Sequence, residues 1–126
     1  MFTRSLEEVI GTERDVNWGN GQSRRLLLAR DGMSYSVTDT VVNAGSESLL
    51  EYKNHLESCY CIEGEGSVEA DGVVYSIKPG TLYALDKHDK HYLRATTTMR
   101  LVCVFNPPLQ GLESHRLSGN GESSHY

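Results

Sequence analysis

Short apolar and β-branched runs recur along most of the chain, and residues typical of turns separate them. The expected strands cover residues 24–30, 33–42, 60–70, 73–80, 81–86, 91–95 and 99–108. Asp31-Gly32 and Asp71-Gly72 mark two of the turns between them. Several short strands at this spacing are typical of an antiparallel sandwich or barrel.

The two ends of the chain differ from this strand pattern. Residues 5–12 predict one short helix, with Ser5 as N-cap and Glu8 completing a capping box. Residues 17–23 are expected to form a loop from their composition. Residues 110–126 are polar and glycine-rich, so we expect a flexible tail, or a lid that becomes ordered when it closes over a site.

The length and charge of the chain limit the number of domains and the kinds of partner that can be expected. A chain of 126 residues is long enough for one core and too short for two, so a single domain over residues 1–126 is expected. The 12 basic residues against 17 acidic ones argue against a nucleic-acid partner. No apolar run approaches the ~18 residues of a membrane span, and acidic residues stand where a signal peptide would be apolar. We therefore expect a cytoplasmic protein without a membrane partner.

The spacing of charged residues and glycines in the middle of the chain is that of the first cupin motif, G-x5-H-x-H-x3-E-x6-G. The motif falls on Gly45, Glu51, Lys53, Glu57 and Gly64. Glu51 and Lys53 stand where cupins have two metal-binding histidines on the inner wall of a small β-barrel. The chain has therefore either lost its metal or changed its ligands.

The second cupin motif, G-x5-P-x-G-x2-H, follows after the length of one hairpin. It falls on Gly80, Asp86, His88 and His91. The ligand histidine is kept as His91, whereas His88 is interpreted as a solvated turn residue. The paired motifs predict an all-β fold: a cupin-type, jelly-roll-like antiparallel β-barrel with one short N-terminal helix.

Alternation along the strands predicts which side chains share a face. One face would carry His55, Glu57, Cys59 and Cys61, provided that the strand is unbroken. On the last strand one face carries Met99, Leu101, Cys103 and Phe105, but alternation does not decide which face lines the cavity. Tyr52 would point away from Glu57 unless the chain bends near Asn54. The three cysteines form no disulfide framework and are expected to be free, buried thiols.

Glu57 and His91 alone give a divalent metal too few protein ligands. Tyr83 could be a third, because a metal lowers the pKa of a phenol, or it could be an ordinary core aromatic. His55 could be a core histidine, a general base or a donor to a ligand. Arg25 could be a rim charge, or it could bind a substrate carboxylate with its two-pronged guanidinium.

Longer strings point to one family. They are EYKNHLE at 51–57, YALDKHDKH at 83–91 and CVFNPP at 103–108. With these strings the chain resembles the ectoine synthases, small iron-dependent cupins, over about residues 1–111. The resemblance implies that Glu57, Tyr83 and His91 hold Fe²⁺. It also implies the closure of N-γ-acetyl-L-2,4-diaminobutyrate into ectoine, a cyclic amidine used as a compatible solute, with loss of water.

The same resemblance implies roles for further residues. Tyr52 or His55 would accept a proton from the substrate amine. The positions that match substrate-binding positions are Arg25, Thr38, Thr40, Cys103, Phe105, Glu113 and His115. Enzymes of this family are head-to-tail homodimers, so the same is expected here. Trp18 lies a few residues ahead of the family's tryptophan, and the sequence after His115 departs from the family's acidic segment.

Two other functions remain open from the sequence. One is a different metal-dependent cupin enzyme, such as a dioxygenase or isomerase. Oxygen activation would normally use two or three histidines, and Glu51 and Lys53 occupy two of their places. The other is a non-catalytic ligand-binding cupin, which fits the altered tail but not the retention of the metal ligand set together with Arg25.

Overall fold

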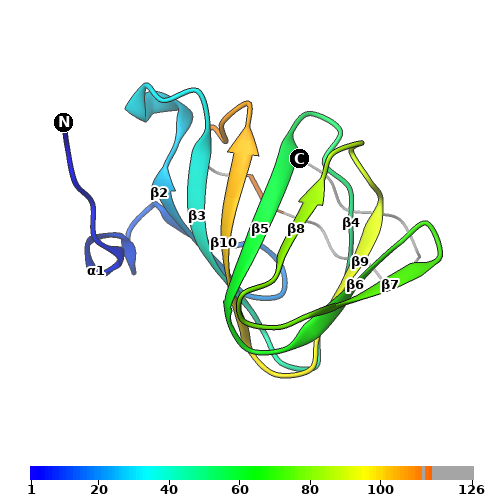
Figure 1. Cartoon of the computed structure of the whole chain (residues 1–126). Helices are drawn as coiled ribbons and strands as arrows, with labels where there is room; N and C mark the ends of the chain where they lie inside the picture. Colours follow the sequence, from blue (N-terminus) through cyan, green and yellow to red (C-terminus); the bar gives the residue numbers. More distant parts are fainter. Residues whose placement is uncertain (112, 115–126) are drawn as a thin grey trace.

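The computed structural model describes residues 1–111, 113 and 114, which form two antiparallel sheets (Figure 1). One sheet has the order β1 (Asp15–Asn17), β2 (Gln22–Leu27), β3 (Ser36–Val42), β10 (Met99–Asn106), β5 (Leu56–Glu63) and β8 (Leu82–Leu85). The other has the order β4 (Glu47–Leu50), β9 (His91–Ala95), β6 (Gly66–Ala70) and β7 (Val73–Ile77). In Figure 1 the sheets converge at the bottom of the view. The all-β architecture agrees with the sequence pattern.

The N-terminal helix α1 (Leu6–Val9) begins where the sequence predicts it. The Ser5 side chain caps it by accepting a hydrogen bond of 3.2 Å from the Glu8 backbone nitrogen. The helix ends earlier than expected because Gly11 adopts the left-handed conformation, with a φ of 80°. Within the described part of the chain, no helix is long and apolar enough to cross a membrane.

Two strands lie where the sequence did not predict them. Residues 17–23 were expected to be a loop, but Asn17 pairs with Gln22 across the β1–β2 hairpin, so only the middle of this segment is a turn. At Gly21 a Cβ would overlap the Val41 carbonyl oxygen, so glycine lets the turn pass close to β3. The second unexpected strand is β4, which pairs with β9 through residues 47–50.

Alternate side chains of the central strands β5 and β10 share a face, as predicted, and the structure shows which face of each strand lies in the core. On β10 the buried residues are Met99, Leu101, Cys103 and Phe105. On β5 they are Glu57, Cys59 and Cys61. The register of the two strands sets Cys103 opposite Cys59 and Phe105 opposite Glu57. The core is thus built around a buried carboxylate rather than around apolar side chains alone.

A cluster of ion pairs ties the N-terminal segment to the turn η1 (Ala29–Asp31) after β2. Asp31 accepts hydrogen bonds from Arg14 at 2.9 Å and from the Leu28 backbone nitrogen at 2.8 Å, and it pairs with Arg4 at 3.3 Å. The hydrogen bond from Arg14 is the main cause that lowers the pKa of Asp31 to about 2. The carboxylate therefore stabilises this corner of the fold.

The Asp31→Asn variant should lose about 1–3 kcal/mol of unfolding free energy at pH 7, because the amide keeps the shape but not the charge. The folded pKa lies below the unfolded value of 3.8, so the contribution is present above pH ~4 and fades as the pH falls toward 2. Urea unfolding at pH 7 and pH 3 should show the gap between variant and wild type narrowing in acid.

The matched control is Glu13→Gln, which removes an exposed pair with Arg30 and should leave the stability nearly unchanged, because water and salt screen such a pair. An Asp31→Asn deficit that is the same at both pH values would contradict the assigned role of the carboxylate charge.

Candidate metal and substrate site

A small cavity lies in the core, with a volume of about 20 Å³. This is room for about one water molecule or one metal ion. Its walls are Trp18, Ser23, Thr40, Leu50, Tyr52, Glu57, Cys59, Tyr83, Leu93, Leu101, Cys103 and Phe105. The walls come from both sheets and include six of the twelve site residues predicted from the sequence, whereas His55, His91 and Arg25 are not among them.

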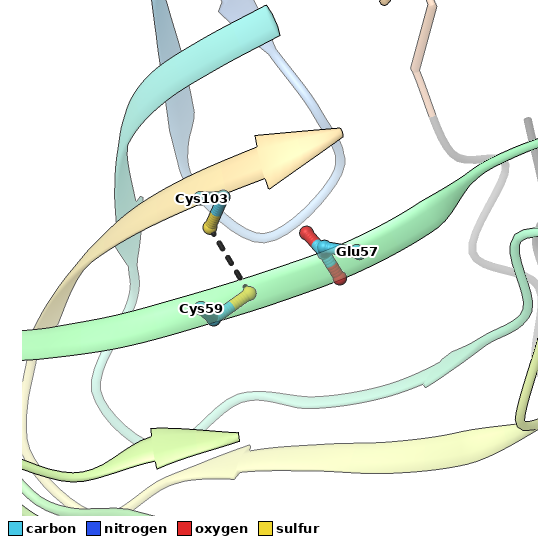
Figure 2. Close-up of side chains that lie close together, drawn as sticks. All are labelled: Glu57, Cys59 and Cys103. Atoms are coloured by element: carbon cyan, nitrogen blue, oxygen red, sulfur yellow. Dashed lines mark hydrogen bonds between the residues drawn. The ribbon is translucent and has the colours of Figure 1, made fainter. Parts of the chain in front are cut away.

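Glu57, the second residue of β5, is 6% exposed and lies beside two thiols, as Figure 2 shows. Burial raises the pKa of Glu57 from its ordinary 4.5 to about 8, although hydrogen bonds with Cys59 and Cys103 lower it in part. Without a cation the carboxyl group is therefore largely protonated at neutral pH. A bound cation would reverse this by stabilising the carboxylate.

Tyr83 on β8 reaches the same cavity as Glu57. Its partner in the β5–β8 ladder is Cys59, so its side chain is on the same face as that of Glu57. Burial, together with the nearby Cys59 and Glu57, raises the pKa of the Tyr83 phenol well above its ordinary value of 10. The ring also packs against the core, which gives Tyr83 a structural role as a core aromatic.

His91 opens β9 in the other sheet and is 1% exposed. Its Nδ1 donates a hydrogen bond of 2.8 Å to the Asp89 carbonyl oxygen, which can only accept. The lone pair of the neutral ring is therefore on Nε2, which is buried and has no hydrogen-bond partner among the described residues. Burial also lowers the pKa of His91, which favours the neutral ring. A fixed tautomer with an open Nε2 is what a metal-binding histidine offers.

The loop between β4 and β5 brings Tyr52 into the cavity. Because β4 ends at Leu50 and β5 begins at Leu56, strict alternation does not apply to the residues between them. The Tyr52 ring meets Phe105 edge-on at a centroid distance of 5.3 Å and lies 5.9 Å from the His91 ring. Tyr52 therefore links the cavity wall to the histidine of the opposite sheet.

His55, at the end of the same loop, is 8% exposed and packs edge-on against Phe105 with ring centroids 5.9 Å apart. Its Nδ1 donates to the Pro107 carbonyl oxygen at 2.7 Å. This bond fixes the orientation of the ring and places the proton of the neutral imidazole on Nδ1.

His88 has a structural role that the sequence did not reveal. It was expected to be a solvated turn residue, and it is exposed with a φ of 55°. However, its Nδ1 donates a hydrogen bond of 2.8 Å to the Tyr52 carbonyl oxygen. His88 therefore holds the loop that carries Tyr52.

Arg25 on β2 is fully buried, which excludes a position on the rim. Its Nη1 donates to the Gly111 carbonyl oxygen at 2.9 Å and lies 3.5 Å from a Glu113 carboxylate oxygen. Its Nη2 donates to the Glu113 carbonyl oxygen. Burial alone would raise the pKa of Glu113, but backbone N–H groups of Gln110 and Gly111, with the charge of Arg25, lower it. The guanidinium therefore faces an acceptor-rich segment.

The remaining predicted residues divide into three groups. Thr38 and Thr40 on β3 lie 2.9 Å apart through their hydroxyl oxygens, and Thr40 lines the cavity. Cys103 and Phe105 also line it. His115 lies outside the described residues, as do most of residues 110–126, so the predicted tail or lid stays a prediction.

Two further residues belong to the cavity. Trp18, whose role the sequence left in doubt, lines it and donates from its ring nitrogen to the Val41 carbonyl oxygen at 2.9 Å. Cys59 was not chosen as a site residue from the sequence. The sequence could have indicated Cys59 as a site residue, because alternation places it on the same strand face as Glu57.

Comparison with known proteins gives a consistent result. The family model described as "Ectoine synthase" matches residues 1–124. The chain is 60% identical over 121 residues to the L-ectoine synthase of Halalkalibacterium halodurans, covering 94% of each chain. It is 53% identical over 123 residues to that of Desulfatibacillum aliphaticivorans, covering 94% of this chain and 95% of the relative.

Solved structures agree with the sequence comparisons. The crystal structure of ectoine synthase from P. lautus superposes with a TM-score of 0.85 and 55% identity, over 88% of this chain and 81% of the other. An RmlC-like cupin from Shewanella frigidimarina has a TM-score of 0.70 and 19% identity, over 85% and 91% of the two chains, and supports the cupin fold alone. The chain belongs to the ectoine synthase family.

Proposed function

We propose that this chain closes N-γ-acetyl-L-2,4-diaminobutyrate into ectoine, with Fe²⁺ held by Glu57, Tyr83 and His91. The observation that carries the reaction is the family match over residues 1–124. The alternatives of a different metal cupin enzyme or a non-catalytic cupin have no comparable support.

The buried groups fit a metal ion. The Nε2 lone pair of His91 has no hydrogen-bond partner among the described residues, and Glu57 needs a cation to ionise near neutral pH. Tyr83 shares the cavity with Glu57 and has a phenol that only a strong Lewis acid would deprotonate. When bound, Fe²⁺ would supply Lewis-acid polarisation of the substrate's acetamide carbonyl.

Arg25 is the proposed partner of the substrate carboxylate, because its guanidinium can bind both carboxylate oxygens. Its donors are engaged by Gly111 and Glu113 in this structure. The cavity of about 20 Å³ is also too small for the substrate. We therefore expect the segment that carries Gly111 and Glu113 to move when substrate binds, which frees Arg25.

The proposed reaction itself is a ring closure, and side chains of the barrel would assist it. The α-amine attacks the acetamide carbon, a C–N bond forms, and the carbonyl oxygen leaves as water with two protons from the amine. His55 would take the first proton at Nε2, since its Nδ1 donates to the Pro107 carbonyl oxygen. Phe105 and Trp18 would hold the substrate folded, so that amine and carbonyl meet.

Replacing His55 by alanine should lower kcat by about 10²–10⁴-fold with a smaller change in KM, as for a general base. Tyr52→Phe should be affected less, because it keeps the ring contact with Phe105 and loses only the hydroxyl. Steady-state kinetics of both variants measure this. Tyr60→Phe on the exposed face of β5 is the control. A larger kcat loss in Tyr52→Phe than in His55→Ala would assign the proton transfer to Tyr52 instead.

The function is tested by incubating iron-loaded protein with N-γ-acetyl-L-2,4-diaminobutyrate and separating the products by chromatography, while an electrode records oxygen. The proposal expects ectoine in proportion to enzyme and no oxygen uptake. Absence of ectoine, with oxygen consumed on a different substrate, would favour a dioxygenase instead.

The family resemblance also supports a head-to-tail homodimer and a cytoplasmic location for this chain. Light scattering of the purified protein should give twice the chain mass of 14.0 kDa. A monomer that is fully active would show that the dimer is not needed for the reaction.

A further inference from the structure

Three buried side chains, those of Glu57, Cys59 and Cys103, lie close together in the barrel. The proposed reaction gives no role to Cys59. Glu57 and Cys59 extend from β5 toward Cys103 on β10 (Figure 2). One ligand atom from each lies within 4.8 Å of the others, and the two sulfur atoms are 3.2 Å apart. Cys59 and Cys103 are register partners in the ladder, so the backbone itself holds the thiols together.

This arrangement has the chemistry of a site for a borderline or soft cation. Thiolate sulfur and carboxylate oxygen are both zinc ligands, and sulfur favours Zn²⁺ over hard cations such as Mg²⁺. Bonds of about 2.3 Å from a tetrahedral zinc to each sulfur place the two sulfur atoms roughly 3.8 Å apart. The observed 3.2 Å needs only a small side-chain adjustment to reach this value. Tyr83, in hydrogen-bond contact with Cys59, provides a further oxygen beside the cluster.

We propose that Glu57, Cys59 and Cys103 form a thiolate-containing subsite that binds Zn²⁺ or Co²⁺. On binding, the two thiol protons pass to solvent and two metal–sulfur bonds form. The subsite uses Glu57, which the proposed iron site also uses, so the two metals exclude each other. The mutual exclusion of the two metals rests on the proposed function, whereas the binding of Zn²⁺ or Co²⁺ by the two thiolates does not.

Cobalt is a suitable probe, because a thiolate bound to Co²⁺ gives a strong charge-transfer absorption in the near ultraviolet that carboxylate and imidazole ligands do not give. Metal-free, reduced, full-length protein titrated with Co²⁺ should develop this absorption and saturate at one equivalent per chain. Added Zn²⁺ should abolish it. Cys59→Ser and Cys103→Ser should each weaken Co²⁺ binding by about tenfold or more, since even outer partners of a metal ligand contribute that much.

Cys61 is the matched control. It lies on the same strand, is fully buried, and directs its sulfur to the Glu63 and Gly64 carbonyl oxygens at 3.4 and 3.6 Å. Cys61→Ser should keep the absorption. Circular dichroism checks that each variant folds, and Cys59→Ala replaces any serine variant that does not.

His91→Ala separates this inference from the proposed iron site. It should lose iron but keep the cobalt–thiolate absorption, because His91 is not part of the cluster. Wild-type protein that binds Co²⁺ without the absorption, or that binds no Co²⁺, would overturn the inference. Neither result would contradict the proposed iron site, which is tested separately by iron analysis. An absorption that survives in the Cys59→Ser/Cys103→Ser double variant would overturn it as well.

Discussion

Glu57→Gln protein should purify with less than about a tenth of the wild-type iron and should lose roughly 10³-fold or more in kcat. The amide keeps the shape of the side chain but cannot supply the negative ligand, and the Lewis-acid contribution of a metal is several kcal/mol. Iron analysis and product formation, measured on the same preparation, test both effects.

The same variant should also change the pH dependence of stability in metal-free protein. The folded pKa of Glu57, about 8, lies above the ordinary 4.5, so the folded state holds a proton that the unfolded chain has released. Wild-type unfolding free energy should therefore fall by up to about 1.4 kcal/mol per pH unit between pH ~5 and ~8, whereas Glu57→Gln should remain flat. Urea titrations at several pH values measure the two slopes.

Glu63→Gln is the control for both measurements, because Glu63 lies on the same strand but pairs at the surface with Arg100 at 3.0 Å. It should keep iron and activity. Full iron content in Glu57→Gln would show that this carboxylate is not a ligand.

Arg25→Met should raise KM by about 10²-fold or more and lower stability by about 1–3 kcal/mol. The first effect follows because the substrate carboxylate would lose its two-pronged partner. The second follows because the partly buried acceptors on Gly111 and Glu113 would lose their donor. Steady-state kinetics and urea unfolding separate the two effects.

Arg24 provides the comparison, since it is the preceding residue on β2 and pairs with Asp39 at 2.6 Å rather than with the C-terminal segment. Arg24→Met should cost stability without a comparable rise in KM. An unchanged KM in folded Arg25→Met protein would remove Arg25 from the substrate site.

The parts of the fold that depend on local pattern could be predicted from the sequence. Alternation on β10 correctly paired Cys103 with Phe105 on one face, and Ser5 caps the predicted helix. The short strand β4 was missed because its four residues, Glu47–Leu50, are too few to show a clear alternation, and they become a strand by pairing with β9.

The site depended more on long-range geometry. Tyr52 was expected in the cavity only if the strand was interrupted, and the gap between β4 and β5 provides that interruption. The contact between Cys59 and Cys103 depends on the register of two strands 44 residues apart, which no local pattern encodes. The hydrogen bond from His88 to Tyr52 likewise joins two loops that are distant in the chain.

Anomalous X-ray diffraction at the iron absorption edge, from crystals of active iron-loaded protein, tests the central claim most directly. The account predicts one strong peak per chain inside the barrel, within bonding distance of a Glu57 carboxylate oxygen, the Tyr83 hydroxyl and His91 Nε2. A peak held by other residues, or an active crystal with no iron in the barrel, would contradict it.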